Sequence, residues 1–131
     1  MLVGLRFKPV PVVHPVPTLG FIVDAGDVAV VFTSDTYQTD EIWAEANKLA
    51  NVQAVFVDCS FPIEMEKLAK DSGHMTPKMI SAEAQKLKRP TSMYCVHLKP
   101  SYRDVVLEQL LPYKSCGIEA AEIGKVYKWG K

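Results

Sequence analysis

The chain has 131 residues, of which 48% are hydrophobic, and its 15 basic and 15 acidic side chains give a formal net charge of zero. A chain of this length can bury one hydrophobic core, so we treat it as a single domain. The balanced charge disfavours a protein that grips nucleic acid with a strongly basic face. No apolar run approaches the roughly 20 residues of a membrane-spanning helix, and the start MLVGLRFKPV is unlike a signal peptide. We therefore expect neither nucleic acid nor a membrane as a partner.

The three cysteines are Cys59, Cys95 and Cys116, which are widely spaced and form no C-x-x-C pair. Cys59 and Cys95 fall inside apolar, strand-like runs, which predicts buried and reduced thiols. An odd number of unpaired cysteines favours a reducing compartment, so the sequence predicts a cytoplasmic protein.

The first third of the chain predicts strands followed by a helix. Residues 5–14 are extended but rich in proline, which is typical of an edge strand. Two apolar runs, 21–23 and 28–32, flank the turn residues DAGD, and this pattern predicts a hairpin. Residues 40–50 follow Thr39 as a candidate cap and place apolar residues at helical spacing, which predicts a helix.

The rest of the chain alternates predicted strands and helices. They are a strand at 53–60, helices at 62–71 and 77–88, a strand at 91–97, a helix at 102–111 and one or two short strands within 118–130. We expect Ser101 to cap the helix at 102–111, with Asp104 completing a capping box. Alternation of this kind predicts an α/β protein whose sheet is partly parallel.

Four polar residues follow the ends of predicted strands, namely His14, Asp35, Asp58 and His97. In α/β sheets, ligands bind beyond the carboxyl ends of the strands. Any one of these residues alone could be a capped turn or a satisfied core group. Four at equivalent positions instead predict a functional site.

The stretch DSGHMTP at 71–77 places His74 on a loop before a helix. Thr76 and Pro77 suit a helix start, where free N–H groups and the helix dipole favour anions. Gly73 permits a positive φ and a close approach of a ligand to the backbone. The loop can therefore bring a phosphate against an imidazole, although loop histidines are also common without such a role.

Together these motifs resemble a known family. VHPVPTLGFIV at His14, TSDT at Asp35, DSGHMTP at His74 and VHLKP at His97 occur in the order and spacing of the metallo-β-lactamase superfamily. The likeness runs from about residue 5 to residue 128 and is greatest to the class II cyclic-nucleotide phosphodiesterases, with ribonuclease Z as a relative. It implies a metal-dependent phosphodiesterase that hydrolyses 3′,5′-cyclic nucleotides such as cyclic AMP.

The resemblance also implies a role for individual residues. His14 and His97 are expected to bind different ions of a two-metal site, and Asp35 to bridge both ions. His74 is expected to contact the scissile phosphate and to stabilise its charge or protonate the leaving oxygen. Asp58 falls where relatives carry a supporting acid, often glutamate.

Two further residues, Lys99 and Thr76, are candidate substrate contacts near these histidines. The expected cofactors are two divalent ions, with Zn²⁺ favoured by imidazole ligands and Mn or Fe as alternatives. Two such ions can hold an attacking hydroxide and the phosphoryl oxygens together.

The same resemblance implies that part of the site lies outside this chain. The superfamily draws most of its metal ligands from an H-x-H-x-D-H motif in its N-terminal half, and no such motif occurs here. Residues 1–131 therefore resemble the C-terminal half of a four-layer αββα sandwich, a mixed sheet with helices on one face. The chain alone is expected to bind metal weakly and to be nearly inactive.

The predicted strands are apolar on both faces, so we expect the uncovered face to pack against another sheet. A homodimer or the missing N-terminal half could supply that sheet. Two alternatives to the cyclic-nucleotide enzyme remain open. One is a ribonuclease Z-like phosphodiesterase, and the other is a non-catalytic half-fold that oligomerises.

Overall fold

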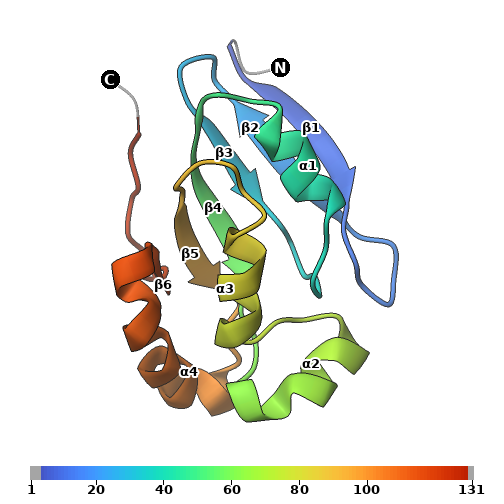
Figure 1. Cartoon of the computed structure of the whole chain (residues 1–131), viewed down its shortest axis with the longest axis vertical. Coiled ribbons are helices and arrows are strands. Elements are labelled where there is room, and N and C mark those ends of the chain that lie inside the picture. The colour runs from blue at the N-terminus through green and yellow to red at the C-terminus, as the bar shows by residue number, and fades with distance from the viewer. Residues whose placement is uncertain (1–3, 130–131) are drawn as a thin grey trace.

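The computed structural model describes residues 4–129, and its strands form one six-stranded sheet (Figure 1). The strands lie side by side in chain order: β1 (Arg6–Pro11), β2 (Leu19–Asp24), β3 (Ala29–Phe32), β4 (Val52–Asp58), β5 (Ser92–Val96) and β6 (Ile118–Ala120). Strands β1 to β3 pair antiparallel, and β3 to β6 pair parallel. The predicted proline-rich edge strand, the hairpin and the partly parallel sheet are all confirmed.

Helical segments connect the parallel strands, as parallel pairing requires. They are α1 (Glu41–Asn47), α2 (Glu66–Ser72), α3 (Pro77–Ala84) and α4 (Arg103–Leu110), with short 3₁₀ turns at Ile63–Met65, Pro100–Tyr102 and Leu111–Cys116. Figure 1 shows α1 and α3 lying across the same face of the sheet. Within residues 4–129, no helix is long and apolar enough to cross a membrane.

The core lies between this face and the helices. One row of fully buried side chains crosses five strands in register, from Ile22 through Val31, Val55 and Met93 to Ile118. Alternation along each strand points these residues to the helices and their neighbours to the opposite face. Cys59 and Cys95 are buried and free, as predicted. The Cys59 thiol donates a hydrogen bond to the sulfur of Cys95, and this bond together with burial raises the pKa of Cys59, so the thiol stays protonated.

The opposite face of the sheet is apolar and largely uncovered. Phe32, Phe56 and Tyr94 lie in register on adjacent strands and stack at ring-centroid distances of 5.2 and 5.4 Å. Tyr127 and Trp129 of the C-terminal segment pack against Phe56. Several large side chains of this face stay exposed: Phe7, Leu19, Phe21 and Phe32. The prediction of strands that are apolar on both faces is confirmed.

Two predicted helix caps are wrong. Thr39 does not cap α1, because that helix begins at Glu41 with Asp40 in the cap position, and the backbone N–H of Thr39 donates to the buried Glu83. Ser101 does not cap α4, because Pro100 starts a 3₁₀ turn that contains Ser101, and Tyr102 takes the cap position. Tertiary contacts and the proline decide both helix starts.

Two predicted helix ends differ as well. The helix expected at 77–88 ends at Ala84, and the segment expected at 62–71 divides into a 3₁₀ turn and α2. Within the described residues, the C-terminal segment contributes the single short strand β6.

The turn between α2 and α3 depends on Gly73. This residue ends α2 in the left-handed region at φ 78°. A Cβ at this position would lie 2.4 Å from Cδ of Pro15 and 2.5 Å from Nδ1 of His14. The loop that follows β1 therefore packs directly on the backbone that carries His74.

We predict that Gly73→Ala lowers the free energy of unfolding by about 2–5 kcal/mol, because left-handed strain adds to a steric clash. Gly117→Ala is the matched control, since Gly117 has φ 81° but its nearest contact is an ordinary 3.7 Å from Thr91 O. The control should lose only about 1–2 kcal/mol. Urea unfolding measures both, and equal losses would show that the packing of the loop on Gly73 is unimportant.

Candidate metal and phosphate site

Four of the predicted site residues meet at one end of the sheet. Asp58 is the last residue of β4, His97 follows β5, and Asp35 lies three residues after β3. His74 comes from the loop between α2 and α3. Ligand atoms of these four side chains all lie within 4.8 Å of one another. The parallel strands bring together residues that are far apart in the sequence, as expected for carboxyl strand ends.

The carboxylate of Asp58 is the centre of this group. It is buried, with 1% of its side chain exposed, and it accepts three hydrogen bonds. Ser60 donates its hydroxyl to Oδ1 at 2.6 Å, while the backbone N–H of Thr36 and Nδ1 of His74 reach Oδ2 at 3.0 and 2.6 Å. Three chain segments are thus joined through one side chain.

Counting protons fixes the orientation of both imidazoles. The single hydroxyl proton of Ser60 goes to Asp58, so its oxygen is free to accept a hydrogen bond from Nδ1 of His97 at 3.1 Å. Nδ1 of His97 also lies 3.2 Å from Oδ1 of Asp35. Nδ1 of His74 lies 2.6 Å from Oδ2 of Asp58, so this nitrogen carries a proton and donates a hydrogen bond to the carboxylate. Each ring then keeps Nε2 for a ligand.

Burial and hydrogen bonding act in opposite directions on Asp58. Burial raises the pKa of this carboxyl, and the bonds from Ser60, His74 and Thr36 offset part of that rise. A carboxylate that accepts three hydrogen bonds is held in one position, so its contact with Nδ1 of His74 fixes the orientation of that ring.

The backbone beside the group adopts an uncommon conformation. His97 has φ 62° and Ser34, the neighbour of Asp35, has φ 58°. Such values cost a non-glycine residue about 1–2 kcal/mol. Flanking contacts hold this backbone: Cys59 N–H donates to Val96 O at 3.0 Å, and the Ser34 hydroxyl donates to Leu19 O at 2.8 Å. Strain of this kind is often found at functional sites.

His14 lies beside the group rather than in it. Its Nδ1 contacts the backbone oxygen of Gly73 at 3.0 Å, and its ring packs edge-on against His74 with centroids 5.4 Å apart. The four residues whose ligand atoms cluster do not include His14. The role of His14 as a metal ligand therefore stays a prediction, while its contacts indicate that it supports the His74 loop.

The two predicted substrate contacts also differ in position. The ammonium of Lys99 lies 5.9 Å from the ring centroid of Phe61, and that ring lies 5.8 Å from His74, so Lys99 borders the site. Thr76 is buried at the N-terminal end of α3 and lines a separate cavity with Gln38.

Ser60 is a site residue that no motif predicts. The available signal is its spacing, since a hydroxyl two residues after a carboxylate can bond to it at the end of a strand. Thr36 is similar, because its hydroxyl lies within hydrogen-bond distance of both N and O of Val13 and so ties the loop after β1 to the group. The contacts of Ser60 and Thr36 form only when the loops fold against one another, so the sequence motifs do not predict them.

The side chains present fit a divalent metal ion. Two carboxylates and two imidazoles are donors that Zn²⁺, Mn²⁺ or Fe accepts. Both oxygens of the Asp58 carboxylate already accept hydrogen bonds. The side chains of Asp35 and His97 are about 45% and 42% exposed, so they are open to a ligand. Catalytic zinc normally has three protein ligands, so Asp35 and His97 would make a partial coordination sphere.

We predict that Ser60→Ala raises the pKa of Asp58 further, because the ionised carboxylate loses the hydroxyl that donates to it at 2.6 Å. The variant should lose about 1.5–3 kcal/mol of stability at neutral pH. That loss should shrink as pH falls through the raised pKa of Asp58, because the protonated carboxyl depends less on the donor.

A carboxyl-carbon NMR titration and urea unfolding at several pH values measure these effects. Ser72→Ala is the control, since that hydroxyl bonds Leu68 O at 2.6 Å on α2. An unchanged pKa of Asp58 in Ser60→Ala would contradict the assigned network.

Solved structures share this fold. The metallo-beta-lactamase fold protein YhfI from Bacillus subtilis is 18% identical with a TM-score of 0.77, over 97% of this chain and 51% of that one. The human tRNase Z short form is 18% identical with a TM-score of 0.66, over 92% and 41%. A putative Zn-dependent hydrolase of the metallo-beta-lactamase superfamily from Thermotoga maritima is 16% identical with a TM-score of 0.57, over 84% and 52%.

This chain therefore spans about half, or less, of the length of these structures. A comparison of the sequence with curated proteins finds no match. A family model described as the beta-lactamase superfamily domain matches residues 1–98, which is most of the chain. The chain belongs to the beta-lactamase superfamily.

Proposed function

We propose that this chain forms part of a metal-dependent phosphodiesterase that hydrolyses 3′,5′-cyclic nucleotides such as cyclic AMP. The observation that carries the proposal is the 2.6 Å contact between buried Asp58 and His74, beside the open ligands Asp35 and His97. An imidazole oriented by a buried carboxylate, next to a metal-binding pair, is suited to phosphoryl chemistry.

Each side chain has a distinct task in the proposed reaction. Asp35 and His97 hold the metal centre, which when bound supplies the positive charge that attracts the phosphoryl oxygens and activates water. Asp58 accepts the hydrogen bond from Nδ1 of His74 and so orients the ring, with Nε2 available to the substrate. Water forms the new P–O bond and releases a proton to solvent, the bond to the leaving oxygen breaks, and His74 in its doubly protonated form transfers its Nε2 proton to that oxygen. Lys99 borders the site as a further positive charge.

We propose that the remaining metal ligands come from an N-terminal half with an H-x-H-x-D-H motif. Asp35 and His97 alone fall short of the three ligands that catalytic zinc requires. On this proposal residues 1–131 are one partial domain, binding two ions only weakly by themselves. Zn²⁺ is the favoured metal, with Mn or Fe as alternatives.

We also propose that the uncovered sheet face packs on a second sheet. Its exposed aromatic residues, with Phe7 at 57% and Phe32 at 41% exposure, form a surface that soluble monomers seldom leave in contact with water. The N-terminal half or a second copy of the chain is the proposed occupant. The free cysteines Cys59, Cys95 and Cys116 fit a cytoplasmic location.

A ribonuclease Z-like activity is the second candidate. The likeness to the human tRNase Z short form supports it, although at 18% identity this is a likeness of fold. The net charge of zero counts against it, because an RNA-binding enzyme needs a positive surface for phosphates. A non-catalytic half-fold that oligomerises is the third candidate.

The decisive assay measures hydrolysis of 3′,5′-cyclic AMP and of a precursor tRNA with Zn²⁺ present. We expect no hydrolysis by the chain alone, and hydrolysis of cyclic AMP when it is joined to an N-terminal half that carries the motif. His74→Gln should lower kcat by about 10²–10⁴-fold, which is the usual contribution of a general acid. Lys70→Gln on the exposed side of α2 is the control and should leave kcat unchanged.

Other outcomes separate the candidates. Cleavage of precursor tRNA without hydrolysis of cyclic AMP would favour the ribonuclease Z-like enzyme, and no cleavage of either substrate would favour the non-catalytic half-fold. His14→Gln tests the remaining metal-ligand prediction, since loss of bound metal in this variant would give His14 a ligand role.

A further inference from the structure

A cavity opens beside the candidate site where strands β5 and β6 diverge. Their last paired residues are Cys95 and Ala120, and Ala121 N–H still donates to Cys95 O at 2.9 Å. Beyond this point the chain leaves the sheet and turns at Gly124, whose φ is 79°. The resulting cavity has a volume of about 250 Å³ and lies at the carboxyl end of β5. Ligands of parallel sheets bind at such ends.

The cavity is continuous with the candidate site through His97. This residue lines the cavity, while its Nδ1 contacts Asp35 and Ser60 in the group described above. A ligand whose phosphate rests at His97 and His74 therefore has the adjoining cavity within reach. The volume is below the roughly 300–1,000 Å³ of pockets that enclose whole drug-sized ligands, so it suits one part of a larger molecule.

The walls of the cavity combine apolar surfaces with opposite charges. Val96, Leu98 and Ile123 supply the apolar surface, and Arg103 and Glu122 supply the charges. Within residues 4–129, no carboxylate lies within salt-bridge distance of the Arg103 guanidinium. An Arg guanidinium stacks on flat rings and donates hydrogen bonds to their edges, and a carboxylate accepts bonds from amino groups. A nucleobase has both the flat apolar faces and the polar edge that these walls recognise.

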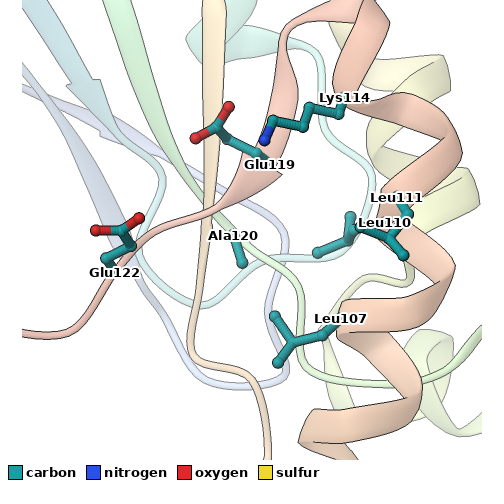
Figure 2. Close-up of a pocket in the computed structure, with 7 residues that line it drawn as sticks. All are labelled: Leu107, Leu110, Leu111, Lys114, Glu119, Ala120 and Glu122. Atoms are coloured by element: carbon teal, nitrogen blue, oxygen red, sulfur yellow. The ribbon is translucent and has the colours of Figure 1, made fainter.

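A neighbouring cavity also combines apolar surface with opposite charges, but it lies apart from the candidate site. It has a volume of about 200 Å³, and Figure 2 shows leucines of α4 and the following turn approaching Ala120, while Lys114 extends toward Glu119. It shares Glu122 with the cavity beside His97, but no residue of the candidate site lines it. Of these two cavities, only the one beside His97 adjoins the candidate site.

We propose that the cavity beside His97 receives the nucleobase of the phosphodiester substrate and that Arg103 contacts this base. The proposal rests on the proposed function, because it takes the phosphate to lie at His74 and His97. Arg103 is then a specificity-determining residue whose loss weakens binding of the base and not of the phosphate.

The test separates base from phosphate by using ligands that carry one or both. Binding of adenosine, ribose 5-phosphate and adenosine 5′-monophosphate to the full chain is followed by backbone amide NMR, with Zn²⁺ present throughout. Adenosine should shift the amides of Arg103, Ala121 and Ile123. Adenosine 5′-monophosphate should bind about tenfold more tightly than ribose 5-phosphate, in line with the usual contribution of base stacking.

Arg103→Gln should remove most of this tenfold preference while leaving the affinity for ribose 5-phosphate unchanged. Ala121→Met, which fills the cavity, should have the same effect by a different route. Arg6→Gln is the matched control, because Arg6 is exposed on β1 and lines neither cavity. The amide spectrum of each variant reports whether it is folded.

The outcomes distinguish this proposal from the proposed function. No response of Arg103, Ala121 and Ile123 to adenosine, or an unchanged preference in both cavity variants, would overturn the base site. If ribose 5-phosphate does not shift the amide signals of His74 and His97, that result would instead overturn the phosphate site. 3′,5′-cyclic AMP and the dinucleotide ApA serve as further ligands. Tighter binding of cyclic AMP would assign the base to a cyclic nucleotide, and tighter binding of ApA would assign it to RNA.

Discussion

The structure of the site depends on one buried carboxylate. Asp58 accepts hydrogen bonds from Ser60, from the backbone of Thr36 and from His74, and these three groups belong to different loops. Without the carboxylate, the backbone N–H of Thr36 would lose the acceptor it has in the structure, and an unsatisfied buried polar group costs about 1–3 kcal/mol. The same bond that stabilises the loops also orients His74, so loop structure and proposed chemistry have a single origin.

The elements that could be predicted from the sequence are those determined by local pattern. Apolar alternation and the DAGD turn gave the hairpin and the strands, because they depend on neighbouring residues only. The start of α1 after Thr39 could not be predicted, since the buried Glu83 draws the Thr39 N–H into a tertiary contact. The contacts of the His14 ring with Gly73 and His74 could not be predicted either, because they join segments far apart in the sequence.

The convergence of Asp35, Asp58, His74 and His97 follows from their positions at strand ends and in one loop. Ser60 and Arg103 could not be identified in this way, because neither belongs to a motif. Ser60 becomes visible through its contact with Asp58, and Arg103 through the cavity where β5 and β6 diverge. The residues of the candidate site thus come partly from motifs and partly from the folded shape of the chain.

Binding of Zn²⁺ to the chain, measured by isothermal titration calorimetry, tests most directly whether these side chains form one metal centre. We predict weak binding of Zn²⁺ by the unaltered chain, weakened further by at least about tenfold in Asp35→Asn and in His97→Gln. Asp27→Asn, an exposed carboxylate in the β2–β3 turn, should bind Zn²⁺ as the unaltered chain does. Equal affinity in all of these proteins would contradict the account, because the convergence of Asp35 and His97 would then have no part in holding a metal.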